Sequence, residues 1–287
     1  MDEESNIESL RWIIHRLIFL VIRKIKTLFF VLIPKLLKGF ILKPGLSFII
    51  RAKNEEENIQ NCIMSIVDIA DEIVFVDNLS TDKTLSIVKK LGESYPKIKI
   101  FEYKVKIPKC GDEQKHQLEI KSSNTIGNYY NWCLNKATRY NIVKWDADCI
   151  ANKKNLFEMV KLHNLHKRND KFSLWFTGET VFTDEKHNYY LNKDSFYDEF
   201  RCYSKLNCFK WTDNEKWEAP LPIYIATSIH ERYEKPCFYE IKNINKKELA
   251  SSRTNGVPLD DRDKVDNEIM QNLKNIKLKK GSLEPIS

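Results

Sequence analysis

Glycine and proline are scarce in this sequence, which holds 8 Gly and 9 Pro in 287 residues. That scarcity excludes collagen-like and low-complexity architectures, and a hydrophobic content of 42% excludes wholesale disorder. Acidic residues are missing between Glu8 and Glu55, where the segment 10–43 contributes eight Lys and Arg. Because the formal net charge is only +7, the rest of the chain is close to neutral. We therefore expect no nucleic-acid partner.

Paired cysteine motifs and glycine-rich phosphate loops are also missing from the sequence. The seven cysteines are an odd number, and no two of them form a C-x-x-C pair. This argues against a zinc site of ordinary ligand spacing and against a disulfide framework, so we expect reduced, buried thiols. Neither G-x-G-x-x-G nor G-x-x-x-x-G-K-[ST] occurs, which sets aside dinucleotide-binding and P-loop proteins.

Long uncharged runs are missing from the N-terminal segment, although Leu, Ile, Phe and Val dominate residues 10–42. Charges interrupt this segment too often for a transmembrane helix, and it lacks the pattern of a signal peptide. Apolar residues recur at steps of three or four from Ile14 to Leu32, with Arg16 and Arg23 on the opposite arc. We expect a cytoplasmic protein whose segment 10–42 lies on a membrane surface. The alternative is a helix that packs on the rest of the chain or on a partner.

From residue 46 on, short apolar runs alternate with helical patterns. We predict strands and helices in turn at 46–50, 59–70, 72–76, 81–91, 97–103, 126–137, 141–145 and 154–166. Such alternation builds a mostly parallel, Rossmann-like sheet flanked by helices, so the predicted fold class is α/β. We divide the chain into the basic segment (1–43), an α/β domain (44–240) and a polar C-terminal tail (241–287).

Carboxylate and amide side chains follow three of the predicted strands. Asn54 and Glu55 come after the first strand, Asp77 after the second, and Asp146 and Asp148 after the fourth. Ligands of such sheets bind beyond the carboxyl ends of the strands, so these residues predict one polar site. Side chains two residues apart on an extended segment point to the same side, so the last pair can share one cation. Oxygen ligands favour Mg²⁺ or Mn²⁺; the alternative is that one of these aspartates caps the next helix.

Three segments carry a family resemblance: Ile49-Ile-Arg-Ala-Lys-Asn-Glu-Glu-Glu-Asn58, Ala70-Asp-Glu-Ile-Val-Phe-Val-Asp-Asn-Leu-Ser-Thr-Asp-Lys-Thr84 and Trp145-Asp-Ala-Asp148. They closely resemble family 2 glycosyltransferases with the GT-A fold, nearest to the branch of the lipopolysaccharide core glucosyltransferases. The resemblance covers residues 46–150 and continues faintly to about 240. It implies an inverting transfer of a sugar from a nucleotide diphosphate donor, usually UDP-linked, assisted by a divalent metal.

The resemblance also assigns roles to the residues at the strand ends. It implies that Asn54 and Glu55 lie at the mouth of the nucleotide pocket and that Asp77 bonds the base or ribose. Asp146 and Asp148 would hold the Mn²⁺ or Mg²⁺ ion and the ribose, with Asp148 the firmer metal ligand.

Two further parts of these motifs have two interpretations each. Asp82 matches the family's Ser-Thr-Asp-x-Thr turn, but a helix-capping role explains it equally well. The segment Arg51-Ala52-Lys53 departs from many relatives, which have small or Pro-rich residues there; a cation in it would either meet the charge of a diphosphate or be solvated.

Inversion needs a carboxylate that takes the proton from the acceptor hydroxyl. The segment 196–203 resembles the part of the family that carries this carboxylate, so Asp198 and Glu199 are the catalytic candidates, in undecided order. The further candidates for the base are Glu179, Glu215 and Glu218. Each of these is equally well an ordinary surface acid.

His230 and Glu231 resemble the His-Glu pair found late in this branch. His230 would complete the metal shell, since neutral imidazole is a good Mn²⁺ ligand, while Glu231 would orient it. The alternative is a hydrogen-bonded histidine at a strand end. Trp175 is one of several tryptophans that would either stack on sugar rings or pack in the core.

The sequence as a whole predicts a membrane-associated, metal-dependent, inverting glycosyltransferase. Its partners would be a nucleotide-sugar donor and a glycan, lipid-linked or protein-linked acceptor. The identities of the sugar and of the acceptor depend on the shapes of the side chains that bind them, which the sequence does not reveal. The alternatives are a nucleotidyltransferase on a related fold and a non-catalytic, membrane-tethered protein that binds sugar nucleotides. A nucleotidyltransferase would require a glycine-rich loop near 51–58, where none occurs.

Overall fold

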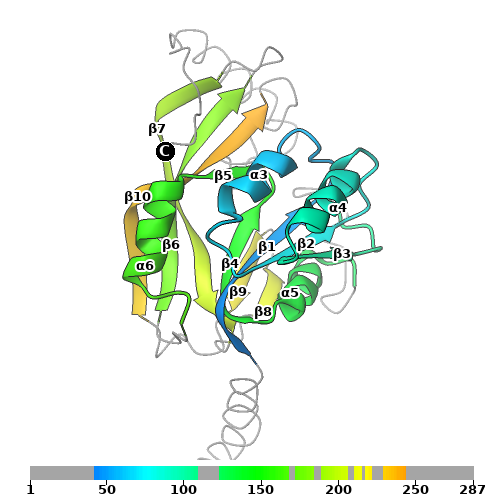
Figure 1. The fold of residues 1–287 in the computed structure, drawn as a ribbon, viewed down its shortest axis with the longest axis horizontal. Helices are drawn as coiled ribbons and strands as arrows, with labels where there is room; N and C mark the ends of the chain where they lie inside the picture. Colours follow the sequence, from blue (N-terminus) through cyan, green and yellow to red (C-terminus); the bar gives the residue numbers. More distant parts are fainter. Residues whose placement is uncertain are drawn as a thin grey trace, which may run out of the picture. The chain divides into compact units, whose positions relative to one another are not determined.

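One eight-stranded sheet with helices on both faces carries the fold of the protein in a computed structural model (Figure 1). The structure describes residues 42–108, 123–167, 172–183, 189–205, 210–214, 217–221 and 229–243. The elements in chain order are β1 (Lys43–Ala52), α3 (Ile59–Ile66), β2 (Glu72–Asp77), α4 (Thr84–Ser94), β3 (Ile98–Glu102), α5 (Ile126–Lys136), β4 (Arg139–Asp146), β5 (Cys149–Ala151), α6 (Lys153–Leu162), β6 (Phe172–Thr183), β7 (Tyr189–Ser204), β8 (Lys210–Asn214), β9 (Trp217–Leu221) and β10 (Ile229–Asn243).

The strands follow the order β3-β2-β1-β4-β7-β6-β10-β5, and β8 and β9 form a separate two-stranded sheet. The pairs β1–β2, β2–β3 and β6–β10 are parallel. Strand β7 runs antiparallel to both β4 and β6, and β5 runs antiparallel to β10. The predicted α/β class is confirmed, and antiparallel pairs occur where the sequence predicted no strands.

Alternating side chains of β1 pack into two different cores. Phe48 and Ile50 belong to the larger core, which is built with residues of α3, α4 and α6. Ile49 points to the other face and packs with residues of α5, such as Tyr129 and Cys133. Burial on both faces explains why the strand reads as one continuous apolar run in the sequence.

The predicted helices are present, and α3 and α5 begin at the predicted residues, Ile59 and Ile126. Helix α4 begins at Thr84 instead of residue 81, and α6 begins at Lys153 instead of residue 154. The last described strand ends at Asn243, so the folded domain extends past the predicted boundary at 240. The segment 10–42, apart from Leu42, and the tail from 244 on lie outside the described residues.

The described cysteines are Cys62, Cys133, Cys149, Cys202 and Cys237, and all of them are buried free thiols. This confirms the prediction of reduced, buried cysteines for the described part of the chain. No helix within the described ranges is long and apolar enough to cross a membrane.

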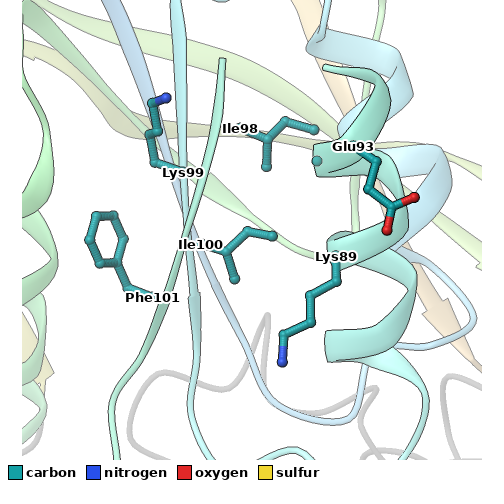
Figure 2. Close-up of a pocket in the computed structure, with 7 residues that line it drawn as sticks. Lys89, Glu93, Ile98, Lys99, Ile100 and Phe101 are labelled. Carbon is teal, nitrogen blue, oxygen red and sulfur yellow. The ribbon is translucent and has the colours of Figure 1, made fainter. Parts of the chain in front are cut away.

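A surface hollow of 490 Å³ lies between α4 and β3 (Figure 2). Its lining includes Lys89, Glu93 and Phe101. None of the predicted site residues lines it, so the candidate site lies elsewhere.

Candidate active site

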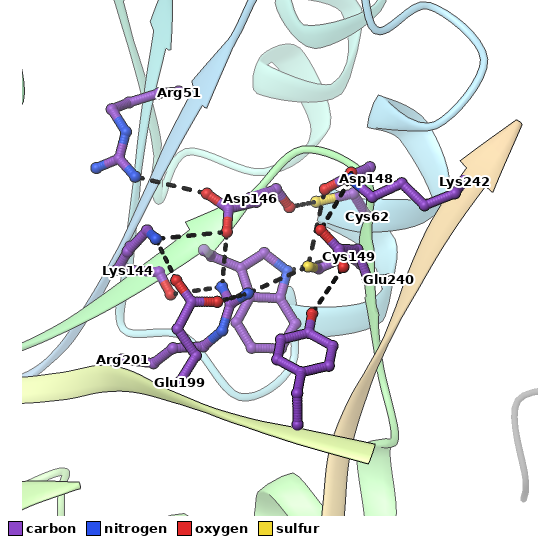
Figure 3. Close-up of polar contacts among 12 residues, drawn as sticks. Arg51, Cys62, Lys144, Asp146, Asp148, Cys149, Glu199, Arg201, Glu240 and Lys242 are labelled. Carbon is purple, nitrogen blue, oxygen red and sulfur yellow. Dashed lines mark hydrogen bonds and ion pairs between the residues drawn. The ribbon is translucent and has the colours of Figure 1, made fainter. Parts of the chain in front are cut away.

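Asp146 ends β4 among three cations from three different strands (Figure 3). Its carboxylate lies 3.0 Å from Arg201 Nη1, 3.5 Å from Arg51 Nη2 and 3.8 Å from Lys144 Nζ. Lys144 stands two residues earlier on β4, so the strand turns both side chains to the same side. Arg51 comes from β1, and its guanidinium also stacks 3.6 Å from the centre of the Tyr130 ring. The three cations hold the Asp146 carboxylate in place at the end of the strand.

Asp148 lies in the turn between β4 and β5 and contacts a different cation, Lys242 of β10. Lys242 Nζ lies 2.7 Å from Asp148 Oδ2 and 2.8 Å from Glu240 Oε1. Tyr197 donates a hydrogen bond of 2.9 Å to Glu240. The two aspartates of the predicted metal motif are thus both paired with cations of the chain.

The two candidates for the base point in opposite directions, as neighbours on a strand do. Glu199 forms ion pairs with Lys144 and, at 2.6 Å, with Arg201, next to Asp146. Asp198 accepts a hydrogen bond from the Thr177 hydroxyl and pairs with Arg232, whose side chain is 61% exposed. Of the two, the structure brings only Glu199 together with the strand-end aspartates.

Arg201 is fully buried and joins Asp146 to Glu199. In the pairing of β6 with β7, Leu174 faces Cys202 and Trp175 faces Phe200, so Arg201 has no partner on β6. Such a β-bulge turns one side chain away from the regular alternation and is frequent beside active sites. The guanidinium carbon of Arg201 lies 4.1 Å from the centre of the Phe238 ring, and this cation–π contact stabilises its charge.

Burial and charge act against each other on these carboxyl groups. Burial by itself would raise the pKa of Asp146, but Lys144, Arg201 and Arg51 outweigh it and hold the pKa well below its ordinary value. For Glu199 as well, Arg201 and Lys144 outweigh burial and lower the pKa. Burial raises the pKa of Glu240, and the nearby ammonium of Lys242 offsets only part of this. The site therefore contains two strongly ionised carboxylates and one whose charge is disfavoured.

Asp77, at the end of β2, is 4% exposed and has one unsatisfied oxygen. Its Oδ2 accepts a hydrogen bond from the Ser80 backbone amide at 3.1 Å. Its Oδ1 has no hydrogen-bond partner among the described residues. Leaving a buried acceptor without a donor costs free energy, so a water molecule or a ligand group that donates a hydrogen bond to this oxygen would be stabilising.

Hydrogen bonds tie the loop after β1 to the loop after β2. The backbone of Asn54 has a φ of 59°. Its side-chain oxygen accepts a 2.8 Å hydrogen bond from the backbone amide of Thr81, and its own backbone amide donates to the Ser80 hydroxyl. The amide of Glu55 donates to the Thr84 hydroxyl at 2.7 Å. Asp82 accepts bonds from the amides of Thr84 and Glu56, so it joins both loops. These bonds place Asn54 and Glu55 beside the end of β2 as the sequence predicted, and they reveal a structural task for Asp82.

The structure does not bring His230 together with the strand-end aspartates. His230 pairs with Ser173 near the start of β10, whereas Lys242, which contacts Asp148, lies near the end of that strand. Glu179 is buried, and burial raises its pKa. Trp175 is 41% exposed on β6. Glu215 lies outside the described residues, as do the side chains of Glu218 and Glu231.

Asp146 and Asp148 are the right type of ligand for a divalent metal ion. No group of three or more His, Cys, Asp or Glu that could hold a metal is present in the part of the chain that the structure describes. A Mg²⁺-type site does not need one, since such ions are bound by one or two carboxylates together with substrate phosphates and water. The donor set therefore fits a metal that binds together with a diphosphate.

Sequence reasoning missed Lys144, Arg201, Glu240 and Lys242. Lys144 could have been predicted from the sequence, because it stands two residues before Asp146 on a predicted strand. Arg201 lies inside the segment already considered for the base, two residues after Glu199, and contacts the same cluster. Glu240 and Lys242 lie on either side of the predicted domain boundary, in a stretch without a recognised strand.

The first part of the domain is similar to known proteins. Residues 47–106 match the sequence model of the family "Glycosyl transferase family 2". An uncharacterized glycosyltransferase of Rickettsia bellii (strain RML369-C) is 44% identical over 52 residues, and one of Rickettsia typhi (strain ATCC VR-144 / Wilmington) is 49% identical over 47 residues. These matches cover 18% and 16% of each chain, so this chain spans less than a fifth of the relatives' length. The match agrees with the predicted family over residues 47–106, and the lipopolysaccharide core branch stays a prediction.

Solved structures give partial likenesses. A mannosyltransferase from Pyrobaculum calidifontis in complex with GDP-Man and Mn²⁺ is 15% identical with a TM-score of 0.46, over 83% of this chain and 66% of that one. Glucosyl-3-phosphoglycerate synthase from Mycobacterium tuberculosis, in complex with Mn²⁺, UDP and phosphoglyceric acid, is 17% identical with a TM-score of 0.32. The second likeness covers 48% of this chain and 43% of that one.

Proposed function

We propose that this chain is an inverting glycosyltransferase. It transfers a sugar from a nucleotide diphosphate donor, with a UDP-sugar as the first candidate donor, to a hydroxyl group. One observation carries the proposal: Asp77, Asp146 and Asp148 follow the ends of β2 and β4, two strands that both neighbour β1. Ligands of open α/β sheets bind at these ends. The segment that matches glycosyltransferase family 2 contributes the first of the three aspartates.

Asp77 binds the nucleoside in this proposal. Its buried Oδ1 is an unused acceptor that a base N–H or a ribose hydroxyl can satisfy. The bonds between the two neighbouring loops fix the walls of this position, with Asn54 and Glu55 at its mouth.

The diphosphate of the donor lies near Asp146 and Asp148 in this proposal. A bound Mn²⁺ or Mg²⁺ would neutralise the charge that develops on the leaving diphosphate, with Asp148 and Asp146 as its carboxylate ligands. Arg51 and Lys144 remain on the same side of the sheet and add positive charge there, independently of any metal.

Glu199 is the better of the two candidates for the base. Its carboxylate lies on the side of Asp146, where the diphosphate of the donor is proposed to bind. Asp198 points to the other side of β7, toward Thr177 and Arg232. We expect Glu199→Gln to lower kcat at least a hundredfold and Asp198→Asn to leave it within threefold. Comparable losses in both variants would contradict this assignment.

The nucleotide proposal is tested by thermal stabilisation in a screen of UDP- and GDP-sugars with Mn²⁺ present, since a ligand that binds only the folded state raises the melting temperature. We expect at least one nucleotide sugar to stabilise the wild type and the Asp77→Asn variant to bind it at least tenfold more weakly. The matched control is Asp68→Asn, which changes an exposed aspartate that pairs with Lys153. The proposal fails if no nucleotide sugar stabilises the protein, or if both variants respond as the wild type does.

A further inference from the structure

Lys242 pairs with Asp148, the carboxylate that would hold a metal ion in the proposed function. Its Nζ lies 2.7 Å from Asp148 Oδ2 and 2.8 Å from Glu240 Oε1 (Figure 3). The side chain of Lys242 is 11% exposed, and those of its two partners are 17% and 13% exposed. Little water reaches this ammonium, so its two carboxylate partners provide most of its stabilisation.

Backbone pairing fixes where this lysine lies. Strand β10 runs antiparallel to β5, with Glu240 opposite Cys149. One residue further, the amide of Ile241 donates a 2.8 Å hydrogen bond to the carbonyl of Asp148. The next residue is Lys242, so the strand itself carries the ammonium to the aspartate.

Each of the two aspartates already has a cation of the chain as its partner, in two separate groups of ion pairs. Arg51, Lys144 and Arg201 face Asp146 and Glu199, whereas Lys242 faces Asp148 and Glu240. A divalent ion on Asp148 would lie close to the Lys242 ammonium, and like charges repel strongly in a site with little water. An ion held by Asp148 would have to share this carboxylate with the ammonium.

We propose that Lys242 is a built-in counter-ion of Asp148, which competes with the divalent metal and leaves the carboxylate when metal and diphosphate bind. This inference rests on the proposed function, because it takes Asp148 as the metal ligand. A diphosphate offers the displaced ammonium a new anionic partner, so nucleotide and metal binding support each other. Without nucleotide, the metal has to displace Lys242 unaided, and its affinity is low.

The test is Mn²⁺ binding to the full chain without nucleotide, measured by isothermal titration calorimetry. We expect Lys242→Met to bind Mn²⁺ at least tenfold more tightly than the wild type, because the competing cation is gone. The matched control is Lys235→Met on the same strand, whose exposed ammonium pairs with Glu158 and should not alter Mn²⁺ affinity. Equal or weaker Mn²⁺ binding by Lys242→Met would overturn the inference.

The Lys242→Met variant leaves two buried carboxylates without their cation, which can prevent folding. Lys242→Gln keeps a hydrogen-bond donor without the charge and is measured in parallel, with the same tenfold gain expected. A second readout is the melting temperature: Mn²⁺ should raise it in the Lys242 variants more than in the wild type. Equal shifts in all chains would contradict the competition.

These experiments, together with a turnover assay of the wild type, separate this inference from the proposed function. If the wild type turns over a nucleotide sugar but the Lys242 variants gain no Mn²⁺ affinity, the inference is wrong and the proposed function stands. If no nucleotide sugar is turned over and the variants gain tenfold in Mn²⁺ affinity, the counter-ion is supported and the transferase proposal fails.

Discussion

Arg201 is the residue on which the charge network around Asp146 depends. Its buried guanidinium contacts Asp146 at 3.0 Å and Glu199 at 2.6 Å. Removing one partner of a buried ion pair leaves uncompensated charge and costs about 3–5 kcal/mol. We therefore expect Arg201→Met to lower the free energy of unfolding by about that much, measured by urea denaturation.

Arg232→Met is the matched control for this prediction. Arg232 also pairs with a carboxylate of β7, Asp198, but its side chain is 61% exposed. Exposed ion pairs contribute about 0–1 kcal/mol, so the loss in this variant should stay within that range. A loss in Arg201→Met as small as the one expected for Arg232→Met would show that the network around Asp146 does not stabilise the fold.

Asp146 makes the stability of the folded protein decrease at acid pH. Its neighbouring cations hold the pKa below the ordinary value in the folded protein, so the unfolded chain takes up the proton first as the pH falls. The stabilisation is complete above the unfolded pKa of about 4 and is lost as the pH falls from there toward the folded pKa. We expect the wild type to lose more stability than Asp146→Asn between pH 6 and pH 3 in urea denaturation. Parallel pH profiles of the two proteins would contradict this.

At this scale the sequence predicted the acidic residues of the site better than the basic ones. Asp77, Asp146 and Asp148 follow apolar runs directly, and this position marks them in the sequence. Lys242 reaches Asp148 from 94 residues further along the chain, through the pairing of β10 with β5. Long-range pairing of this kind depends on register, which local patterns do not contain.

Strand β6 is pressed against β10 at Gly178. A Cβ built on Gly178 would lie 2.3 Å from the Phe238 ring, which is fully buried between other core residues. We expect Gly178→Ala to destabilise the protein by about 1–3 kcal/mol or more, because the ring has little room to move. The measurement is thermal or urea unfolding.

Gly92→Ala is the control, since Gly92 lies inside helix α4 and its Cβ would meet only the end of the Ile100 side chain, at 3.3 Å. Alanine in a helix interior is favoured over glycine by about 0.5–1 kcal/mol, so this variant should be neutral or slightly more stable. Destabilisation of both variants by the same amount would contradict the close packing at Gly178.

The elements of the first half were predictable, and those of the second half were not. Strands β1 and β2 are buried on both faces and read as apolar runs, while α3 shows a clear apolar face. Strands β6, β7 and β10 are 12, 16 and 15 residues long, with charged residues and register shifts along them. Bulges interrupt the alternation that identifies a strand, and these strands therefore carry no regular pattern.

At the scale of the whole molecule, we propose that the basic segment 10–42 attaches the enzyme to an anionic membrane surface. This segment carries many cations without one acid, although its structure lies outside the described residues. Each Lys or Arg near such a surface contributes about 1 kcal/mol of attraction. Reversing Arg16, Arg23 and Lys26 to Glu in the full chain should therefore abolish co-sedimentation with anionic vesicles. Equal sedimentation of both proteins would contradict the attachment.

The central claim is that the strand-end aspartates serve the transfer of a sugar from a nucleotide. The most direct measurement is the release of nucleoside diphosphate from UDP- and GDP-sugars with Mn²⁺ present, by the wild type and by Asp148→Ala. We predict turnover of at least one nucleotide sugar by the wild type and a loss of at least a hundredfold in Asp148→Ala, with the circular dichroism spectrum unchanged. Absence of turnover in the wild type, or full turnover in the folded variant, would contradict the account.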